Sequence, residues 1–160
     1  MRARHRPEGL ARLRSALARF GVDAPTLERL SEEQIVCGGL SDPQPWMNDP
    51  RLVQCTHVVN CGASTAFSQE TMAWTVNCED TLEFVSAAAR YPGLQRFLHV
   101  GTAMSCGPDR EKLVAERWEF APRERHLVAY TASKAAFEAE VRARYPDLPL
   151  VVAQIGRAHV

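Results

Sequence analysis

The sequence lacks net charge and long apolar runs, and each absence excludes a class of protein. Lysine plus arginine and aspartate plus glutamate each number 19, so the formal net charge is zero, whereas a general nucleic-acid binder is normally basic. No stretch approaches the 18 or more apolar residues that a membrane-spanning helix needs. The 160 residues, 46% of them hydrophobic, suffice for one domain with a buried core. We therefore expect neither a nucleic-acid partner nor a membrane span.

The cysteines lack the spacing of a metal site or a disulfide framework. They are odd in number, no two form a Cys-x-x-Cys pair, and no histidine stands near them at metal-ligand spacing. We interpret them as reduced thiols of a cytoplasmic protein and expect no bound metal. They are Cys37, Cys55, Cys61, Cys78 and Cys106.

Arginine is concentrated at the N-terminus. Apolar residues recur at helical spacing there and Gly21 follows at a C-cap position, which predicts an amphipathic helix over residues 7–20 with a basic outer face. Such a start is also typical of a transit peptide, although Glu8 and the scarcity of serine argue against one.

Further along, short apolar runs alternate with helical segments. Strands are predicted at residues 34–37, 56–60, 97–100 and 149–153, helices at 71–91 and 128–144, and a proline-containing surface loop at 40–50. This alternation favours an α/β fold, a doubly wound parallel sheet with helices on both faces. Ligands of such sheets bind beyond the carboxyl ends of the strands.

Tyr130 and Lys134 carry the clearest chemical signal. Residues four apart share one helix face, so the phenol and the amine point the same way. A cation beside a phenol stabilises the phenolate, which suits proton exchange with a substrate oxygen while hydride moves to or from carbon. The chain holds only two lysines among its 19 basic residues, and one of them stands here. The alternative is an incidental pair on a surface helix.

Thr102 follows the predicted strand 97–100 by two residues and precedes Tyr130 by 28. A hydroxyl at the carboxyl end of a strand can donate to a substrate oxygen and hold it beside the tyrosine. The alternative is a threonine that only forms a turn.

Small residues also follow the predicted strand 56–60. Cys61, Gly62 and Ala63, after Asn60, would let a cofactor approach the backbone closely, and a simple strand-to-loop turn explains them equally well. Asn77 lies inside a predicted helix, where asparagine is unfavourable. It either faces solvent or uses its amide to fix a backbone kink or a water near the lysine.

These segments together resemble the extended short-chain dehydrogenase/reductase family. THVVNCGASTAF resembles its fourth strand and cofactor-lining turn, TVNCEDTLEFVSAA the next helix, RFLHVGTAMSCG the fifth strand, and YTASKAAFE the Tyr-x-x-x-Lys helix. The resemblance covers nearly the whole chain, with the motifs in the right order. It implies a Rossmann-like NAD(P)-binding sheet in which Tyr130, Lys134, Thr102 and Asn77 are catalytic and Lys134 also binds the ribose.

Within that family the chain is most similar to the fatty acyl-CoA reductase and thioester reductase subgroup, the "male sterility" type. Arg2 and Arg12 match arginines that the resemblance assigns to the 2′-phosphate of NADP(H), a role that guanidinium forks suit. NADP(H) is therefore favoured over NAD(H), and a solvated basic helix face is the alternative reading of these arginines. The resemblance also assigns cofactor contacts to Gly38, Gly39 and Leu40 and to Asn60, Cys61, Gly62 and Ala63. Gly39 stands where the family has an aspartate, so that contact is either lost or supplied by another residue.

The glycine-rich turn Gly-x-x-Gly-x-x-Gly, which in the family holds the pyrophosphate, does not occur in the 160 residues. We expect it to precede Met1. Residues 1–154 would then be a partial Rossmann domain, truncated at both ends and without its first strand and most of its second. Residues 155–160 resemble the translation of a sequencing adapter and are expected to be non-native. We expect this chain alone to be inactive.

For the parent protein the resemblance implies an NAD(P)H-dependent oxidoreductase that reduces an acyl thioester or a related small-molecule carbonyl by hydride transfer. One alternative is a sugar-nucleotide epimerase or dehydratase on the same fold, whose substrate domain would follow residue 154. Another is a non-catalytic cofactor-binding or scaffold protein.

Overall fold

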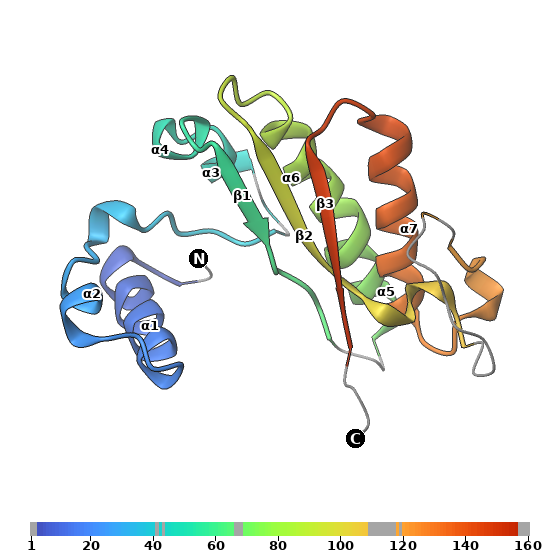
Figure 1. Cartoon of the computed structure of the whole chain (residues 1–160), viewed down its shortest axis with the longest axis horizontal. Helices are drawn as coiled ribbons and strands as arrows, with labels where there is room; N and C mark the ends of the chain where they lie inside the picture. The colour runs from blue at the N-terminus through green and yellow to red at the C-terminus, as the bar shows by residue number, and fades with distance from the viewer. Residues whose placement is uncertain are drawn as a thin grey trace.

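The computed structural model describes residues 3–40, 42, 44–65, 69–108, 118 and 120–156. Three parallel strands form a sheet in the order β1-β2-β3 (Figure 1). The strands are β1 (His57–Asn60), β2 (Arg96–Thr102) and β3 (Leu150–Ile155). The α-helices are α1 (Arg6–Arg19), α2 (Ala24–Glu28), α3 (Gln44–Met47), α4 (Pro50–Val53), α5 (Glu70–Trp74), α6 (Asp80–Ala88) and α7 (Ala129–Arg144). Short 3-10 helices are η1 (Glu32–Gln34), η3 (Ala103–Cys106) and η4 (Arg123–Arg125), and η2 (Thr75–Glu79) is a π-helix.

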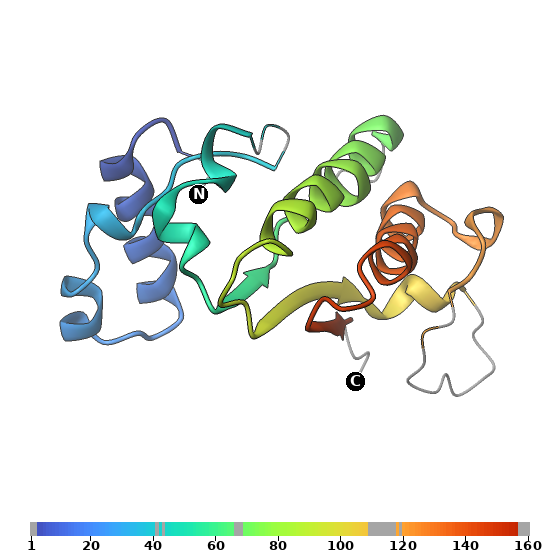
Figure 2. The ribbon, with the colours of Figure 1, turned by 90° about the horizontal axis from the view of Figure 1, so that it is seen from above.

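The sheet is covered on one face by α6 and α7, while α1 and α2 lie beyond its β1 edge (Figure 2). Successive strand residues point to opposite faces, so Phe97 and His99 of β2 are buried, whereas Val59 of β1 is 64% exposed. The predicted parallel pairing of three strands is confirmed. In the described part of the chain, however, helices cover one face of the sheet rather than both.

The predicted strand at 34–37 is wrong. Ile35 is buried, but residues 35–38 follow η1 and belong to no strand of the described sheet. The backbone groups of Ile35 bond elsewhere, because its amide donates to Glu32 O and its carbonyl accepts from Arg51 Nη1. A short apolar run becomes a strand only where a neighbouring strand supplies backbone partners.

Helix α1 forms where the sequence predicts it. The ring of His5 accepts a hydrogen bond from the Glu8 amide at the N-terminus, and Pro7 occupies the first turn. At the other end Gly21 has φ of +79°, and the amide of Val22 returns to Leu17 O.

The helix predicted at 71–91 consists of α5, η2 and α6. In η2 the backbone widens by one residue, and the Thr81 hydroxyl donates to Val76 O at 2.8 Å. Phe97 of β2 and Phe137 of α7 pack with Val85 of α6 in the core, and all three are fully buried. This core fixes α7 over the carboxyl end of β2, where the candidate site lies.

Candidate functional site

Lys134 is buried at the carboxyl end of β2, although lysine is rarely buried without partners. It is 2% exposed, and its Nζ lies 2.6 Å from Val100 O and 2.9 Å from His99 Nε2. His99 is also fully buried and packs against the Phe137 ring. The lysine predicted from the sequence therefore belongs to a buried hydrogen-bond network between α7 and β2, formed with His99 and Val100 O.

Burial shifts the pKa values of Lys134 and His99. It lowers the pKa of Lys134 to about 8, an effect that the nearby Glu138 carboxyl opposes. It lowers the pKa of His99 to about 3, and the charge of Lys134 acts in the same direction. Both side chains therefore exchange protons far from their ordinary pH ranges.

Glu138, one helical turn after Lys134, is fully buried. Burial raises the pKa of its carboxyl to about 7, against the effects of a hydrogen bond from Gln154 and the charge of Lys134. Gln154 Nε2 donates to Glu138 Oε2 at 3.0 Å and to the Ser105 hydroxyl at 2.6 Å, and that hydroxyl donates to Thr102 O. A side chain at Gly101 would overlap Glu138 Oε1, so the glycine makes room for the carboxyl.

Thr102 ends β2 and is 6% exposed. Its hydroxyl accepts from the Met104 amide at 3.3 Å and so caps η3. Tyr130 lies half-buried in the first turn of α7, one turn before Lys134, and its carbonyl accepts from the Ser133 hydroxyl. The expected strand-end threonine and the helical pair thus lie on the adjacent elements β2 and α7.

Asn77 is 1% exposed in η2. Its Oδ1 accepts from the Ser64 amide at 2.7 Å, and its Nδ2 donates to Ser64 O and to the Ser133 hydroxyl. Of the two readings that the sequence allows, the solvent-facing one is wrong. The amide instead ties the loop after β1 to the turn of α7 before Lys134.

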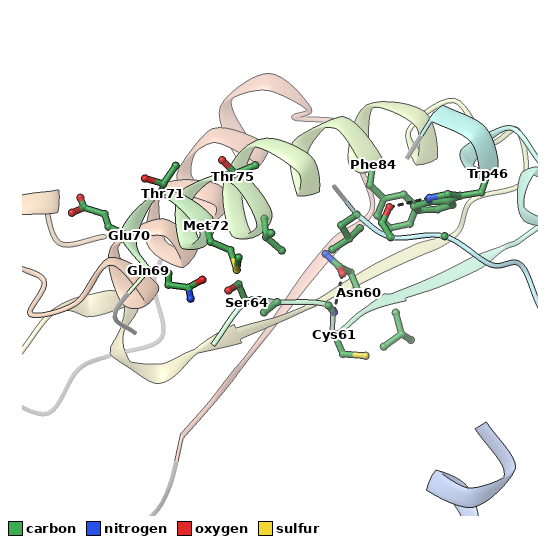
Figure 3. Close-up of a pocket in the computed structure, with 17 residues that line it drawn as sticks. Trp46, Asn60, Cys61, Ser64, Gln69, Glu70, Thr71, Met72, Thr75 and Phe84 are labelled. Carbon is green, nitrogen blue, oxygen red and sulfur yellow. Dashed lines mark hydrogen bonds between the residues drawn. The ribbon is translucent and has the colours of Figure 1, made fainter. Parts of the chain in front are cut away.

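A pocket of about 1180 Å³ opens beside the carboxyl end of β1 (Figure 3). Trp46 and Phe84 line one end, with ring centroids 5.4 Å apart, and the Trp46 indole donates to Gly39 O. All seven predicted cofactor residues of the two glycine-containing turns line it, namely Gly38, Gly39, Leu40, Asn60, Cys61, Gly62 and Ala63. Sequence reasoning missed both aromatic residues. Trp46 lies on α3, inside the segment 40–50 that the sequence predicts to be a loop, and Phe84 lies on α6, far along the chain from both turns.

The other predicted site residues do not line this pocket. Tyr130, Lys134, Thr102 and Asn77 lie on α7, β2 and η2, beyond the lining. Arg12 is on an exposed face of α1, where its guanidinium pairs with Glu8 at 2.8 Å. Arg2 lies outside the described residues.

The pocket lining suits a ligand with a flat ring. Two aromatic rings stand at one end, and small residues at 61–63 leave the backbone accessible after β1. Its place beyond a carboxyl strand end is where parallel sheets bind nucleotides. Among the described residues no cluster of His, Cys, Asp or Glu could hold a metal ion, and no helix is both long and apolar enough to cross a membrane.

Sequence reasoning also missed His99, Ser105 and Gln154. Period-two alternation along β2 could have placed His99 on the buried face with Phe97. Nothing local indicates Ser105 or Gln154, because their partners come from the pairing of β2 with β3.

Comparison with solved structures identifies the fold. The terminal R domain from the myxalamid PKS-NRPS biosynthetic pathway is similar at a TM-score of 0.78 and 19% identity, over 96% of this chain and 40% of that one. The UDP-glucose 4-epimerase from Thermus thermophilus, in complex with NAD, is similar at a TM-score of 0.57 and 23% identity, over 73% of this chain and 39% of that one. RMD from Pseudomonas aeruginosa, complexed with NADPH, is similar at a TM-score of 0.61 and 18% identity, over 74% of this chain and 42% of that one.

The chain thus spans 39% to 42% of the length of these three structures, and 36% of WbmG from Bordetella bronchiseptica. No curated protein matches it. The family described as Male sterility protein matches residues 1–158, which is nearly the whole chain. The chain therefore belongs to the Male sterility protein family and has the Rossmann-like fold of the extended short-chain dehydrogenases/reductases.

Proposed function

We propose that the parent protein of this chain is an NADP(H)-dependent reductase that acts on an acyl thioester or a related carbonyl. The observation that carries the proposal is the buried Lys134 amine at the end of β2, one helical turn after Tyr130. A buried amine with a lowered pKa and a neighbouring phenol are the groups that acid–base chemistry near neutral pH requires.

Each residue has one task in this proposal. Tyr130 gives a proton to the substrate oxygen, and the Thr102 hydroxyl donates a hydrogen bond to that oxygen. Lys134 stabilises the phenolate that remains and binds the ribose. Asn77 is bound to Ser64 and Ser133 and keeps the turn of α7 before Lys134 against the loop after β1.

The cofactor supplies a hydride when bound. We propose that its adenosine part lies along the turns 38–40 and 60–63, beside Trp46 and Phe84. NADP(H) is preferred in this proposal because Arg2 and Arg12 would meet the 2′-phosphate, with NAD(H) as the alternative. Solved relatives hold NAD or NADPH, which supports a nicotinamide cofactor of either kind. We also propose a cytoplasmic location, consistent with five free cysteines.

The likeness to an NAD-bound UDP-glucose 4-epimerase favours a second candidate, a sugar-nucleotide epimerase or dehydratase. The two candidates differ in redox balance. A reductase consumes one reduced nicotinamide for each two-electron reduction, whereas an epimerase returns the hydride to its own substrate and consumes none.

The test follows that difference. The parent protein is given NADPH with acyl-CoA thioesters in one series and UDP-sugars in another, and loss of reduced-nicotinamide absorbance is followed. The proposal expects stoichiometric NADPH loss and aldehyde or alcohol product with thioesters only. Sugar conversion without NADPH loss would establish the epimerase instead. No conversion of either, with cofactor bound, would favour a scaffold role.

A further inference from the structure

A continuous line of hydrogen bonds joins the turn after β1 to Lys134. It begins at the Gly62 amide, 3.2 Å from Asn60 Oδ1, and continues from Asn60 Nδ2 to His99 Nδ1, also 3.2 Å apart. It then runs from His99 Nε2 to Lys134 Nζ at 2.9 Å and ends at Val100 O, 2.6 Å from Nζ. The line starts at a backbone donor and ends at a backbone acceptor, so its two ends have fixed polarity.

The fixed end at Gly62 determines where every proton lies. A backbone N–H only donates, so the Asn60 atom that faces it is the amide oxygen, and the amide nitrogen faces His99. The Asn60 nitrogen only donates, so His99 Nδ1 accepts, and the proton of the neutral imidazole is on Nε2. That N–H points at Lys134 Nζ, which can accept a hydrogen bond only as an uncharged amine.

We propose that His99 is a positioning residue that couples the protonation of Lys134 to the turn at Asn60–Gly62, the arrangement seen here being that of the neutral amine. When Lys134 takes up one proton, Nζ becomes a donor only, and His99 Nε2 must then accept. The imidazole stays neutral and carries its proton on Nδ1, so the Asn60 amide turns its oxygen toward His99. The Gly62 amide thereby loses its acceptor.

This rearrangement reaches the pocket beside β1. Asn60 and Gly62 line that pocket, whereas Lys134 lies outside its lining and is connected to it through His99. The proton on Lys134 therefore changes the hydrogen-bonding groups that the turn presents to a ligand. The catalytic meaning of this coupling rests on the proposed function, whereas the proton positions do not.

Few charged groups near Lys134 could influence its protonation. On α7 the Glu138 carboxyl, and Tyr130 one turn earlier, stand nearest Lys134 along the helix. Next to α7, η2 contributes the Asn77 amide through Ser133, and β3 contributes the Gln154 amide to Glu138. Burial lowers the pKa of Lys134 to about 8, so the neutral amine dominates above that pH. An ionised Glu138 works the other way and favours the ammonium.

The test is a pH titration by heteronuclear NMR of the chain without cofactor. The chain has only two lysines, so Lys112 serves as the internal reference for the Lys134 Nζ signal, and the ¹⁵N shifts of the five histidines report their tautomers. We expect His99 to be protonated at Nε2 above the Lys134 midpoint and at Nδ1 below it. A single tautomer across that midpoint, or Nδ1 protonation above it, would overturn the proposal.

Substitution of His99 by phenylalanine removes the link between Lys134 and the Asn60 amide. The ring packs against Phe137, so an aromatic replacement keeps that contact. In the unaltered chain the NMR signal of the Gly62 amide should shift at the Lys134 midpoint, and in His99→Phe that shift should disappear. A Gly62 shift that persists in His99→Phe would contradict the proposal. His57→Phe, at an exposed position of β1, is the matched control and should retain the shift.

Asn60→Asp is a second variant that does not depend on His99→Phe folding. A carboxylate only accepts, so His99 must carry its proton on Nδ1 throughout, and the pH-dependent change of tautomer disappears. Retention of the wild-type change in Asn60→Asp would refute the coupling. None of these readouts needs turnover, so a parent protein without reductase activity would end the proposed function and leave this inference standing.

Discussion

Gly101→Ala tests whether the buried Glu138 carboxyl depends on a missing side chain in β2. A Cβ at Gly101 would overlap Glu138 Oε1 and come within 3.1 Å of Val152 Cγ1. Glu138 cannot move aside freely, because it is fully buried and its Oε2 holds the 3.0 Å bond from Gln154. Overpacking of this kind costs about 1–3 kcal/mol. For a chain of this size, each kcal/mol lowers Tm by roughly 2–4 °C.

The assay is urea unfolding followed by circular dichroism, with Glu138→Ala as the second arm of a double-mutant cycle. Removal of the carboxyl relieves the overlap, so Gly101→Ala should cost little in that background, with a coupling of about 1–3 kcal/mol. Gly93→Ala is the control, since its nearest neighbour would be Thr56 Cγ2 at 3.7 Å. A Gly101→Ala cost within about 0.5 kcal/mol of wild type, or an equal cost in both backgrounds, would refute the reasoning.

Three further outcomes follow. Asn77→Ala removes three hydrogen bonds and leaves the Ser64 backbone unpaired, so urea unfolding should show a loss of about 1–3 kcal/mol in the free energy of unfolding. Asn48→Ala, at an exposed position, should change that free energy little. Equal losses in the two variants would contradict the account. Between pH 8 and 10.5 the folded chain releases the Lys134 proton while the unfolded chain still holds it. The unfolding free energy of the wild type, measured relative to that of Lys134→Met, should therefore rise by up to about 1.4 kcal/mol per pH unit. A difference in unfolding free energy that does not change with pH would contradict this. NADPH titrated into the 160-residue chain should quench the tryptophan fluorescence only weakly, because the chain holds no glycine-rich turn for the pyrophosphate, and micromolar binding would refute that expectation.

Local patterns predict the part of the fold that depends on short-range chemistry. The capped helix α1, the three paired strands and the α7 helix follow from periodicity and end residues. The run at 35–37 has the same apolar, β-branched character as β1, yet it is not a strand, because strand formation depends on a partner that local sequence does not report. The π-turn inside the predicted 71–91 helix is likewise settled by contacts around Asn77 and Thr81.

In the candidate site, too, local patterns predict some features and long-range contacts determine the others. Helical spacing predicts that Tyr130 and Lys134 share a face, and small residues predict an accessible turn at 61–63. The partners of Lys134 could not be foreseen, because His99 is 35 residues away and reaches Lys134 through sheet register and helix packing. The assigned catalytic roles stay predictions, and the hydrogen bonds around these residues show which variants test them.

The most direct test of the central claim is Tyr130→Phe in the parent protein, assayed for thioester-dependent NADPH oxidation and for NADPH binding. Loss of the phenol proton should lower turnover by about 10²–10⁴-fold, the usual contribution of a positioned acid or base, with cofactor affinity nearly unchanged. Tyr145→Phe, at the end of α7, is the matched control and should retain turnover. Unchanged turnover in Tyr130→Phe would contradict the account.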